Sequence, residues 1–126
     1  MSKRLQRVGN LFVSGLHRLL SGSLLLIGYR GRRSGRRFTI PVMYAERDGT
    51  LTIFVGHPER KNWWRNLRQG AEVEVRLRGD RLRGHAALVD DAGVVSTYLK
   101  RYPRARAALE ATDAPIFIRV AALEPS

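Results

Sequence analysis

Hydrophobic residues recur at helical spacing over the first 20 positions of the chain. Leu5, Val8, Phe12, Leu16 and Leu19 fall three or four residues apart, with polar and basic residues between them. This spacing predicts an amphipathic helix over residues 1–20. Such a helix either caps the hydrophobic core or lays its basic face against a membrane surface, and the sequence leaves both interpretations open.

From residue 23 onward the pattern is typical of β-strands joined by tight turns. Apolar runs alternate with turn signals such as Asp48-Gly49 and Gly79-Asp80. Pro41, which lies within the second run, favours a place at an edge or a bulge of the sheet for that strand. Six strands are predicted, at residues 24–29, 38–44, 51–55, 73–77, 82–89 and 115–123.

Helical segments are expected in the long connections between strands. Because the strands are joined mostly by hairpins, the sequence predicts a mainly β, antiparallel six-stranded barrel with flanking helices rather than a doubly wound sheet. At 126 residues the chain is expected to form a single domain, residues 1–126, with the barrel in residues 23–123. The predicted helices run over residues 62–68, from an Asp90 or Asp91 cap to Lys100, and from Pro103 to Ala111.

The formal net charge of +12 indicates that an anionic ligand, a nucleic acid or a membrane surface lies close to the protein. Most of the excess is arginine, whose planar fork suits bidentate binding of phosphate or carboxylate. The chain has no cysteine, which excludes disulfides and thiolate chemistry and suits a reducing cytoplasm. We expect no metal site, no signal peptide and no spanning segment, and therefore a cytoplasmic protein that is peripheral to a membrane at most.

The turn between the first two strands concentrates basic residues. Gly31 and Gly35 permit positive φ angles and a close approach of the backbone, and Ser34 adds a hydroxyl. Backbone amides and guanidinium groups in such a turn can converge on one phosphate, whereas the alternative is a solvated basic hairpin. The four arginines of the turn are Arg32, Arg33, Arg36 and Arg37.

Two adjacent tryptophans lie in the predicted short helix. In an α-helix their side chains point about 100° apart, so they cannot share one core face. Trp63, four residues before Leu67, is predicted to belong to the core. Trp64 is predicted to wall a planar ligand, to stack on an arginine or to cover the mouth of the barrel.

These motifs together resemble the deazaflavin-dependent nitroreductases, a family of the flavin/deazaflavin oxidoreductases with a split β-barrel fold. The resemblance covers residues 20–123. It implies a split β-barrel that binds coenzyme F-420, with FMN as the alternative cofactor. The residues that carry it are Gly31-Arg32-Arg33-Ser34-Gly35, Pro41, Asp48-Gly49, Trp63 and Asn66-Leu67.

The resemblance also implies where the cofactor binds. The candidate sites are the basic turn, the second strand, the loop after the third strand and the short helix. Basic residues nearby are candidate contacts of the acidic cofactor tail, namely Arg36, Arg37, Lys61 and Arg65. The implied cofactor contacts are Arg32, Arg33, Ser34, Gly35, Thr39, Ile40, Pro41, Val42, Val55, Gly56, His57, Asn62, Trp63, Trp64 and Asn66.

One position departs from the family pattern. Where many members have an arginine three residues past the second glycine of the turn, this chain has Phe38, with Arg37 one step earlier. Neighbouring residues of a strand face opposite sides. Either a local bulge brings Arg37 to the phosphate or that contact is absent, which leaves the choice between coenzyme F-420 and FMN open.

No catalytic residue is assigned firmly, because the cofactor itself carries hydride chemistry. His57 is a candidate proton donor beside the cofactor ring. The resemblance implies Tyr98 and Tyr102 as candidate counterparts of tyrosines near the substrate pocket of the family, and Tyr98 is the second candidate catalytic residue.

The resemblance implies an oxidoreductase that transfers hydride from reduced coenzyme F-420 to a small conjugated acceptor, such as a quinone, a nitro compound or an enone. One alternative is a split barrel that binds FMN, haem or a fatty acid without this activity. Another is a nucleic-acid-binding barrel, which the lack of a run of exposed aromatic residues on the strands disfavours. Both a monomer and a homodimer remain open.

Overall fold

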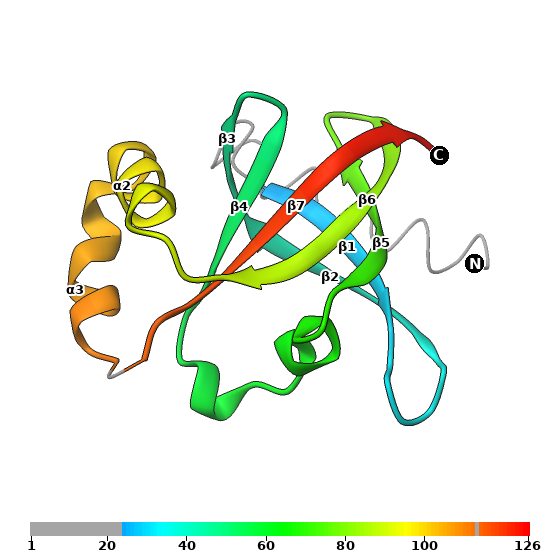
Figure 1. The fold of residues 1–126 in the computed structure, drawn as a ribbon, viewed down its shortest axis with the longest axis horizontal. Helices are drawn as coiled ribbons and strands as arrows, with labels where there is room; N and C mark the ends of the chain where they lie inside the picture. The colour runs from blue at the N-terminus through cyan, green and yellow to red at the C-terminus, as the bar shows by residue number, and fades with distance from the viewer. Residues whose placement is uncertain (1–23, 113) are drawn as a thin grey trace.

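One antiparallel sheet makes up most of the protein. The computed structural model describes residues 24–112 and 114–126, so the helix predicted over residues 1–20 lies outside the described residues. The strands follow the order β2-β1-β5-β6-β7-β4-β3, and the sheet curls around one interior (Figure 1). The strands are β1 (Leu24–Arg30), β2 (Arg37–Met43), β3 (Ala45–Arg47), β4 (Thr50–Val55), β5 (Ala71–Leu77), β6 (Asp80–Val89) and β7 (Ile116–Pro125).

The mainly β, antiparallel barrel-like fold predicted from the sequence is confirmed, but the number of strands is seven rather than six. The additional strand is β3, which pairs with β4 around the turn at Asp48 and Gly49. Both turn residues have positive φ angles, 53° and 75°. Since β3 has only three residues, it is too short for an alternation of apolar and polar positions to reveal it.

The predicted edge position of the proline-containing strand is confirmed, because β2 is the first strand in the sheet order. Its register with β1 is regular from Leu24↔Met43 to Arg30↔Arg37. Pro41 is therefore accommodated at the sheet edge, where one side of the strand has no ladder partner in the sheet.

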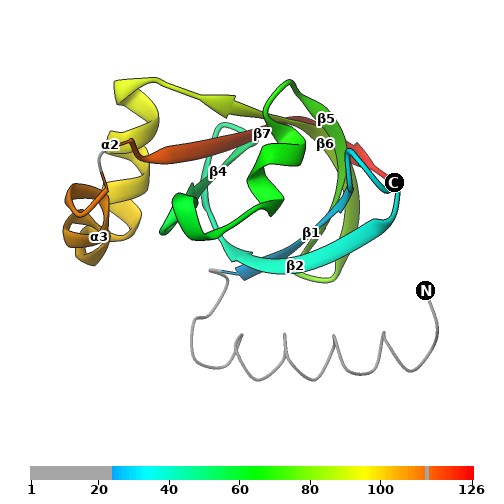
Figure 2. The same cartoon turned by 90° about the horizontal axis from the view of Figure 1, so that it is seen from below.

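Helices occupy the connections between strands, as predicted. Asp91 caps the N-terminus of α2, where its Oδ1 accepts a hydrogen bond from Gly93 N at 2.8 Å, which confirms the expected cap. The 3₁₀ helices η1 and η2 lie across one end of the curled sheet (Figure 2). Within the described ranges no helix has the length and apolar character that crossing a bilayer requires. The helical segments are η1 (Pro58–Arg60), η2 (Trp63–Leu67), α2 (Ala92–Arg101), η3 (Pro103–Ala105) and α3 (Arg106–Glu110).

Two hydrophobic clusters hold these elements together. The larger fills the inside of the curl, where residues such as Ile27, Ile53 and Ile118 have no exposed surface. The smaller lies on the outer face of β4 and β7, where α2 places Tyr98 against Phe54 and Phe117 with ring centroids 5.7 Å apart in both cases. The helices thus cover a part of the outer face that is apolar.

Tyr44 provides a test of this packing. Its side chain is 3% exposed, and its hydroxyl has no hydrogen-bond partner among the described residues. An unsatisfied buried hydroxyl costs about 1–3 kcal/mol, so Tyr44→Phe should raise the free energy of unfolding by about that amount. Urea denaturation measures the change.

Tyr102→Phe serves as the matched control. The Tyr102 hydroxyl donates a hydrogen bond to the Tyr44 carbonyl oxygen, so its removal should lower the free energy of unfolding by about 1 kcal/mol. A loss of stability in Tyr44→Phe would contradict the absence of a partner for its hydroxyl.

Candidate functional site

The basic turn and η2 face each other across a groove of about 310 Å³. The Arg32 backbone N–H donates to Asn66 Oδ1 at 2.8 Å, and Arg32 Nη1 donates to the same oxygen at 3.3 Å. Asn66 Nδ2 donates in turn to the Trp63 carbonyl oxygen at 3.0 Å. The Asn66 amide therefore ties the turn to η2 across a separation of 34 residues in sequence.

The turn is held in one conformation by its own backbone. Gly31 N donates to Arg36 O at 2.8 Å, and Arg36 N donates to Ser34 Oγ at 3.2 Å. A Cβ atom at Gly31 would lie 3.0 Å from Ser34 Oγ and 3.1 Å from Phe38 Cε2, so a side chain there would require these two neighbours to shift by a few tenths of an ångström. Gly35 has a φ of 71°, which glycine adopts without strain.

Three exposed groups of this turn line the groove, namely those of Arg32, Arg33 and Ser34. The sequence predicted all three as contacts of a phosphate. Two guanidinium groups and a hydroxyl on one rigid turn form a donor set that suits an anion.

Aromatic side chains form another wall of the groove. The rings of Tyr29 and Phe38 stack with centroids 5.6 Å apart, and Tyr29 lies 6.2 Å from Trp63. Burial raises the pKa of Tyr29, so its phenol keeps its proton at neutral pH. Sequence reasoning missed Tyr29 and Phe38 as site residues, although they flank the turn and face each other in the hairpin register.

Trp64 rather than Trp63 is the more deeply buried of the two tryptophans, while Trp63 packs against the core, as predicted, and also lines the groove. Trp64 is 6% exposed and belongs to the core with Leu67, whereas Trp63 is half-buried and lines the groove. The reason is that η2 is a 3₁₀ helix, in which residues three apart share a face. Trp64 does not wall the groove, but the predicted stacking on an arginine is confirmed, since the Arg65 guanidinium lies 4.9 Å from its ring.

The implied contacts on β2 fall on two faces. Ile40 and Val42 lie opposite Ile27 and Leu25, which are buried inside the curl, whereas Thr39 and Pro41 are exposed on the outer face. Only a ligand that lies along the free edge of the strand meets the backbone of all four residues.

Arg37 shares the outer face with Thr39 and Pro41, because the β1–β2 register has no bulge. Phe38 occupies the groove side instead. Of the two arrangements that the sequence left open, the structure shows the one in which no bulge turns Arg37 toward the groove.

The loop after β4 carries further implied contacts. Val55 is buried in the core, and a Cβ atom on Gly56 would lie 3.9 Å from Lys61 Nζ. His57 has the left-handed backbone angles φ 50° and ψ 59°, and its Nδ1 lies 3.8 Å from Glu59 Oε1. His57 is exposed and does not line the groove.

Asn62, which also lines the groove, accepts a hydrogen bond from Arg65 Nη1 at 2.6 Å. The same Nη1 donates to the Lys61 carbonyl oxygen at 3.4 Å. These bonds hold the Arg65 guanidinium against Asn62, next to the groove.

Tyr98 and Tyr102 lie away from the groove, in the cluster between α2 and the outer face of the sheet. Burial, together with the nearby Tyr102, raises the pKa of Tyr98 to about 12. The phenol of Tyr98 is therefore protonated at neutral pH and packs against Phe54 and Phe117, so the structure gives it a place in packing rather than in the groove.

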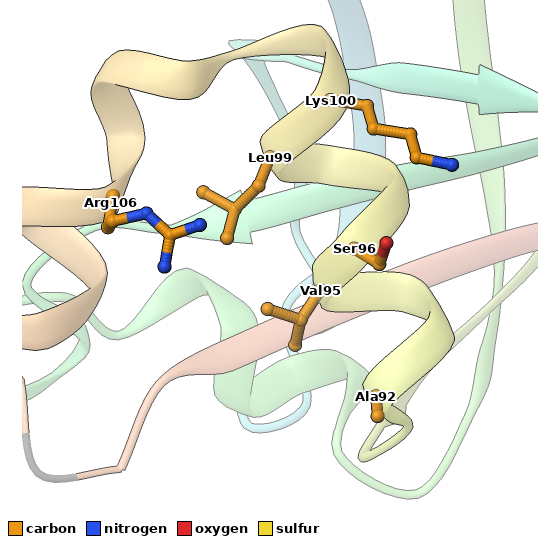
Figure 3. A pocket seen from close by; sticks show the side chains of 6 residues that line it. All are labelled: Ala92, Val95, Ser96, Leu99, Lys100 and Arg106. Atoms are coloured by element: carbon orange, nitrogen blue, oxygen red, sulfur yellow. The ribbon is translucent and has the colours of Figure 1, made fainter.

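A second hollow, of about 390 Å³, lies between α2 and α3 (Figure 3). Its basic groups do not converge, because Lys100 and Ser96 point to one side of α2 whereas Leu99 and Arg106 lie on the other. The turn groove is smaller but brings charged and amide groups together with aromatic rings, so it is the stronger candidate for a ligand site.

Several solved structures share this fold. An F420-H2-dependent reductase, FDR-A, superposes with a TM-score of 0.67 at 22% identity, over 79% of this chain and 94% of that one. The haem storage protein HutZ from Vibrio cholerae gives 0.62 at 13% identity, over 91% and 92% of the two chains. A protein described as a domain-swapped dimer gives 0.69 at 16% identity, over 94% and 100%. At these identities the similarity shows the fold.

The family follows from the sequence itself. The chain belongs to the F420H(2)-dependent quinone reductase family, whose model matches residues 4–122. A Mycobacterium tuberculosis protein described as a candidate F420H(2)-dependent quinone reductase, Rv3178, is 30% identical over 60 residues. The matched stretch covers 45% of this chain and half the length of that relative. The resemblance that the turn and the short helix indicated is confirmed.

The link between the turn and η2 is testable at one atom. Asn66→Ala removes the acceptor of the Arg32 N–H, so hydrogen exchange of the Arg32 amide should accelerate about tenfold, the equivalent of ~1.4 kcal/mol. Exchange followed by NMR measures this. In Asn62→Ala, which removes an acceptor of Arg65 only, the Arg32 amide should exchange at the native rate. Unchanged exchange in Asn66→Ala would show that the link does not hold the turn.

The backbone of His57 is strained, because a side chain in the left-handed region costs about 1–2 kcal/mol. His57→Gly and His57→Ala both remove the imidazole, but only glycine relieves this strain. The free energy of unfolding should be about 1 kcal/mol higher in His57→Gly than in His57→Ala. Equal stability of the two variants in urea would contradict the left-handed conformation.

Proposed function

We propose that this protein transfers hydride from reduced coenzyme F-420 to a quinone-type acceptor, with nitro compounds and enones as further acceptors of the same conjugated class. The observation that carries the proposal is the groove in which the Arg32, Arg33 and Ser34 donors meet an aromatic wall. Membership of the F420H(2)-dependent family supports the same cofactor. FMN remains the comparison ligand in the test below.

The donor set of the groove fits the phosphate end of this cofactor. Arg33 is exposed toward the groove, and Ser34 Oγ is fixed by the Arg36 amide. Each charge-assisted hydrogen bond contributes about 1.5–3 kcal/mol, so two or three account for micromolar affinity. Among the candidate tail contacts, Lys61 and Arg65 lie beside the groove, whereas Arg37 lies on the other face of β2.

The cofactor supplies a hydride when it is bound, and the residues of this chain supply position and environment. Tyr29, Phe38 and Trp63 provide apolar surface that excludes water from one side of the groove. The Asn66 amide fixes the distance between the turn and η2, and thus the relative position of the phosphate and of the ring-bearing part of a bound cofactor.

The absence of cysteine supports a cytoplasmic location. Which conjugated acceptor is reduced depends on the surfaces next to the groove rather than on the anion-binding turn. The rates with different acceptors are therefore measured after cofactor binding has been established.

The decisive measurement is a titration of coenzyme F-420 fluorescence with the protein, with FMN in a parallel titration. Arg33→Ala should weaken binding of coenzyme F-420 about 10- to 100-fold, because it removes a charge-assisted contact. Native affinity should also fall with rising salt.

Arg78→Ala is the matched control, since Arg78 lies at the β5–β6 turn, at the opposite end of the sheet from the basic turn (Figure 1). It removes the same charge and should leave the affinity unchanged. No fluorescence change at micromolar protein, or equal losses in both variants, would overturn the proposal.

A further inference from the structure

The outer face of the sheet changes character from one strand to the next. On β5 and β6 the outward positions are charged and form cross-strand ion pairs, such as Arg81 Nε to Glu74 Oε1 at 3.3 Å. On β7 and β6 the same holds for Arg83 Nε and Glu124 Oε1, 2.8 Å apart. These strands present a surface suited to water.

Where the start of β1 pairs with the end of β2, the outward positions are apolar instead. Leu24 lies opposite Met43, and Leu26 lies opposite Pro41, so four apolar side chains share one patch. We call these four residues the outer patch. Met43 is 36% exposed, and no described helix packs over this part of the sheet.

Another apolar area of the outer face, on β4 and β7, is covered by a helix. The outward residues Phe54 and Phe117 on β4 and β7 are also apolar, and α2 covers them with Tyr98. The charged part of the outer face, on β5 and β6, is exposed to solvent, whereas the apolar part on β4 and β7 is covered by α2. The outer patch is the exception within the part of the chain that the structure describes.

We propose that residues 5–19 of this chain cover the outer patch. Their apolar positions, Leu5, Val8, Phe12, Leu16 and Leu19, have the spacing of one helix face. β1 begins at Leu24, a member of the patch itself, so only a few residues of chain connect the end of the segment to the patch.

The length of residues 5–19 and the extent of the family match both support this segment as the cover of the outer patch. A helix of 15 residues is about 22 Å long, close to the length of a strand of seven residues such as β1, so the segment is long enough to span the outer patch. The family model begins its match at residue 4, which places the segment inside the conserved unit of the family. Pairing of the apolar stripe with the outer patch also leaves the basic residues of the segment, such as Arg7 and Arg18, facing water.

The test uses the full chain, whose lack of cysteine allows a single thiol to be introduced. Leu26→Cys places that thiol in the centre of the outer patch, and Arg78→Cys places one at an exposed turn. We expect a thiol reagent to react at least about tenfold more slowly in Leu26→Cys than in Arg78→Cys.

A second substitution in Leu26→Cys identifies the cover. Phe12→Asp places a charge in the apolar stripe and should restore fast reaction, whereas Ser14→Asp places the same charge on the polar side and should leave the protection intact. Equal reaction rates of the thiols in Leu26→Cys and Arg78→Cys, or protection that survives Phe12→Asp, would overturn the proposal. Protection that disappears on dilution would identify a second copy as the cover and would overturn it as well.

Thermal unfolding gives an independent reading. Leu26→Glu and Phe12→Asp should each lower Tm by several degrees, and the double variant should unfold close to the lower of the two single values, because both changes disrupt the same contact. Additive losses would contradict a shared contact. Addition of anionic vesicles should leave the thiol of Leu26→Cys protected, and release by vesicles would assign the segment to a membrane surface instead.

Discussion

The candidate site depends on one side-chain amide. Asn66 Oδ1 accepts the backbone N–H of Arg32 from the basic turn, and Asn66 Nδ2 holds the Trp63 carbonyl oxygen of η2. Hydrogen bonds inside the turn set its conformation against the mutual repulsion of its four arginines, and the Asn66 bridge sets its position relative to η2. With this bridge, the guanidinium groups of Arg32 and Arg33 face the aromatic wall across a defined groove.

The curl of the sheet makes this bridge possible. β1 and β2 form one edge of the sheet, and β4, which leads into η2, lies near the other edge. Because the sheet closes on itself, segments that are distant in the strand order meet at one end, where η1 and η2 lie across the opening (Figure 2). Hydrophobic burial inside the curl, by residues such as Ile27 and Ile53, thus brings together the polar groups at its rim.

Much of the fold could be predicted from the sequence, because alternation of apolar and polar residues identifies half-buried strands. The short strand β3 escaped this reasoning, since three residues show no period. The burial of Trp64 was missed for a different reason. The prediction assumed 3.6 residues per turn, and only the structure shows that η2 has the tighter 3₁₀ geometry that puts Trp64 beside Leu67.

Site residues could be predicted from the sequence where the side chain itself indicates the ligand, as arginine and serine indicate an anion. Arg32, Arg33 and Ser34 lie in the groove as the motif indicated, whereas Tyr29 and Phe38 entered it through cross-strand register, which depends on turn geometry. Tyr98 shows the opposite case, a residue whose chemistry suggested a role but whose surroundings are those of a packed core.

The hydrogen-bond bridge between Asn66 and the turn restricts the amino acid at position 66 more than the amino acid at position 32. Its closest contact at the turn is with a backbone N–H, which every amino acid except proline presents in the same place. Position 32 is therefore free to change its side chain, and with it the charge offered to a ligand, while the turn keeps its attachment. Position 66 has no such freedom, because the bridge needs an acceptor and a donor on one short side chain. Ligand preference can thus drift among relatives through the turn while the frame that presents it stays the same.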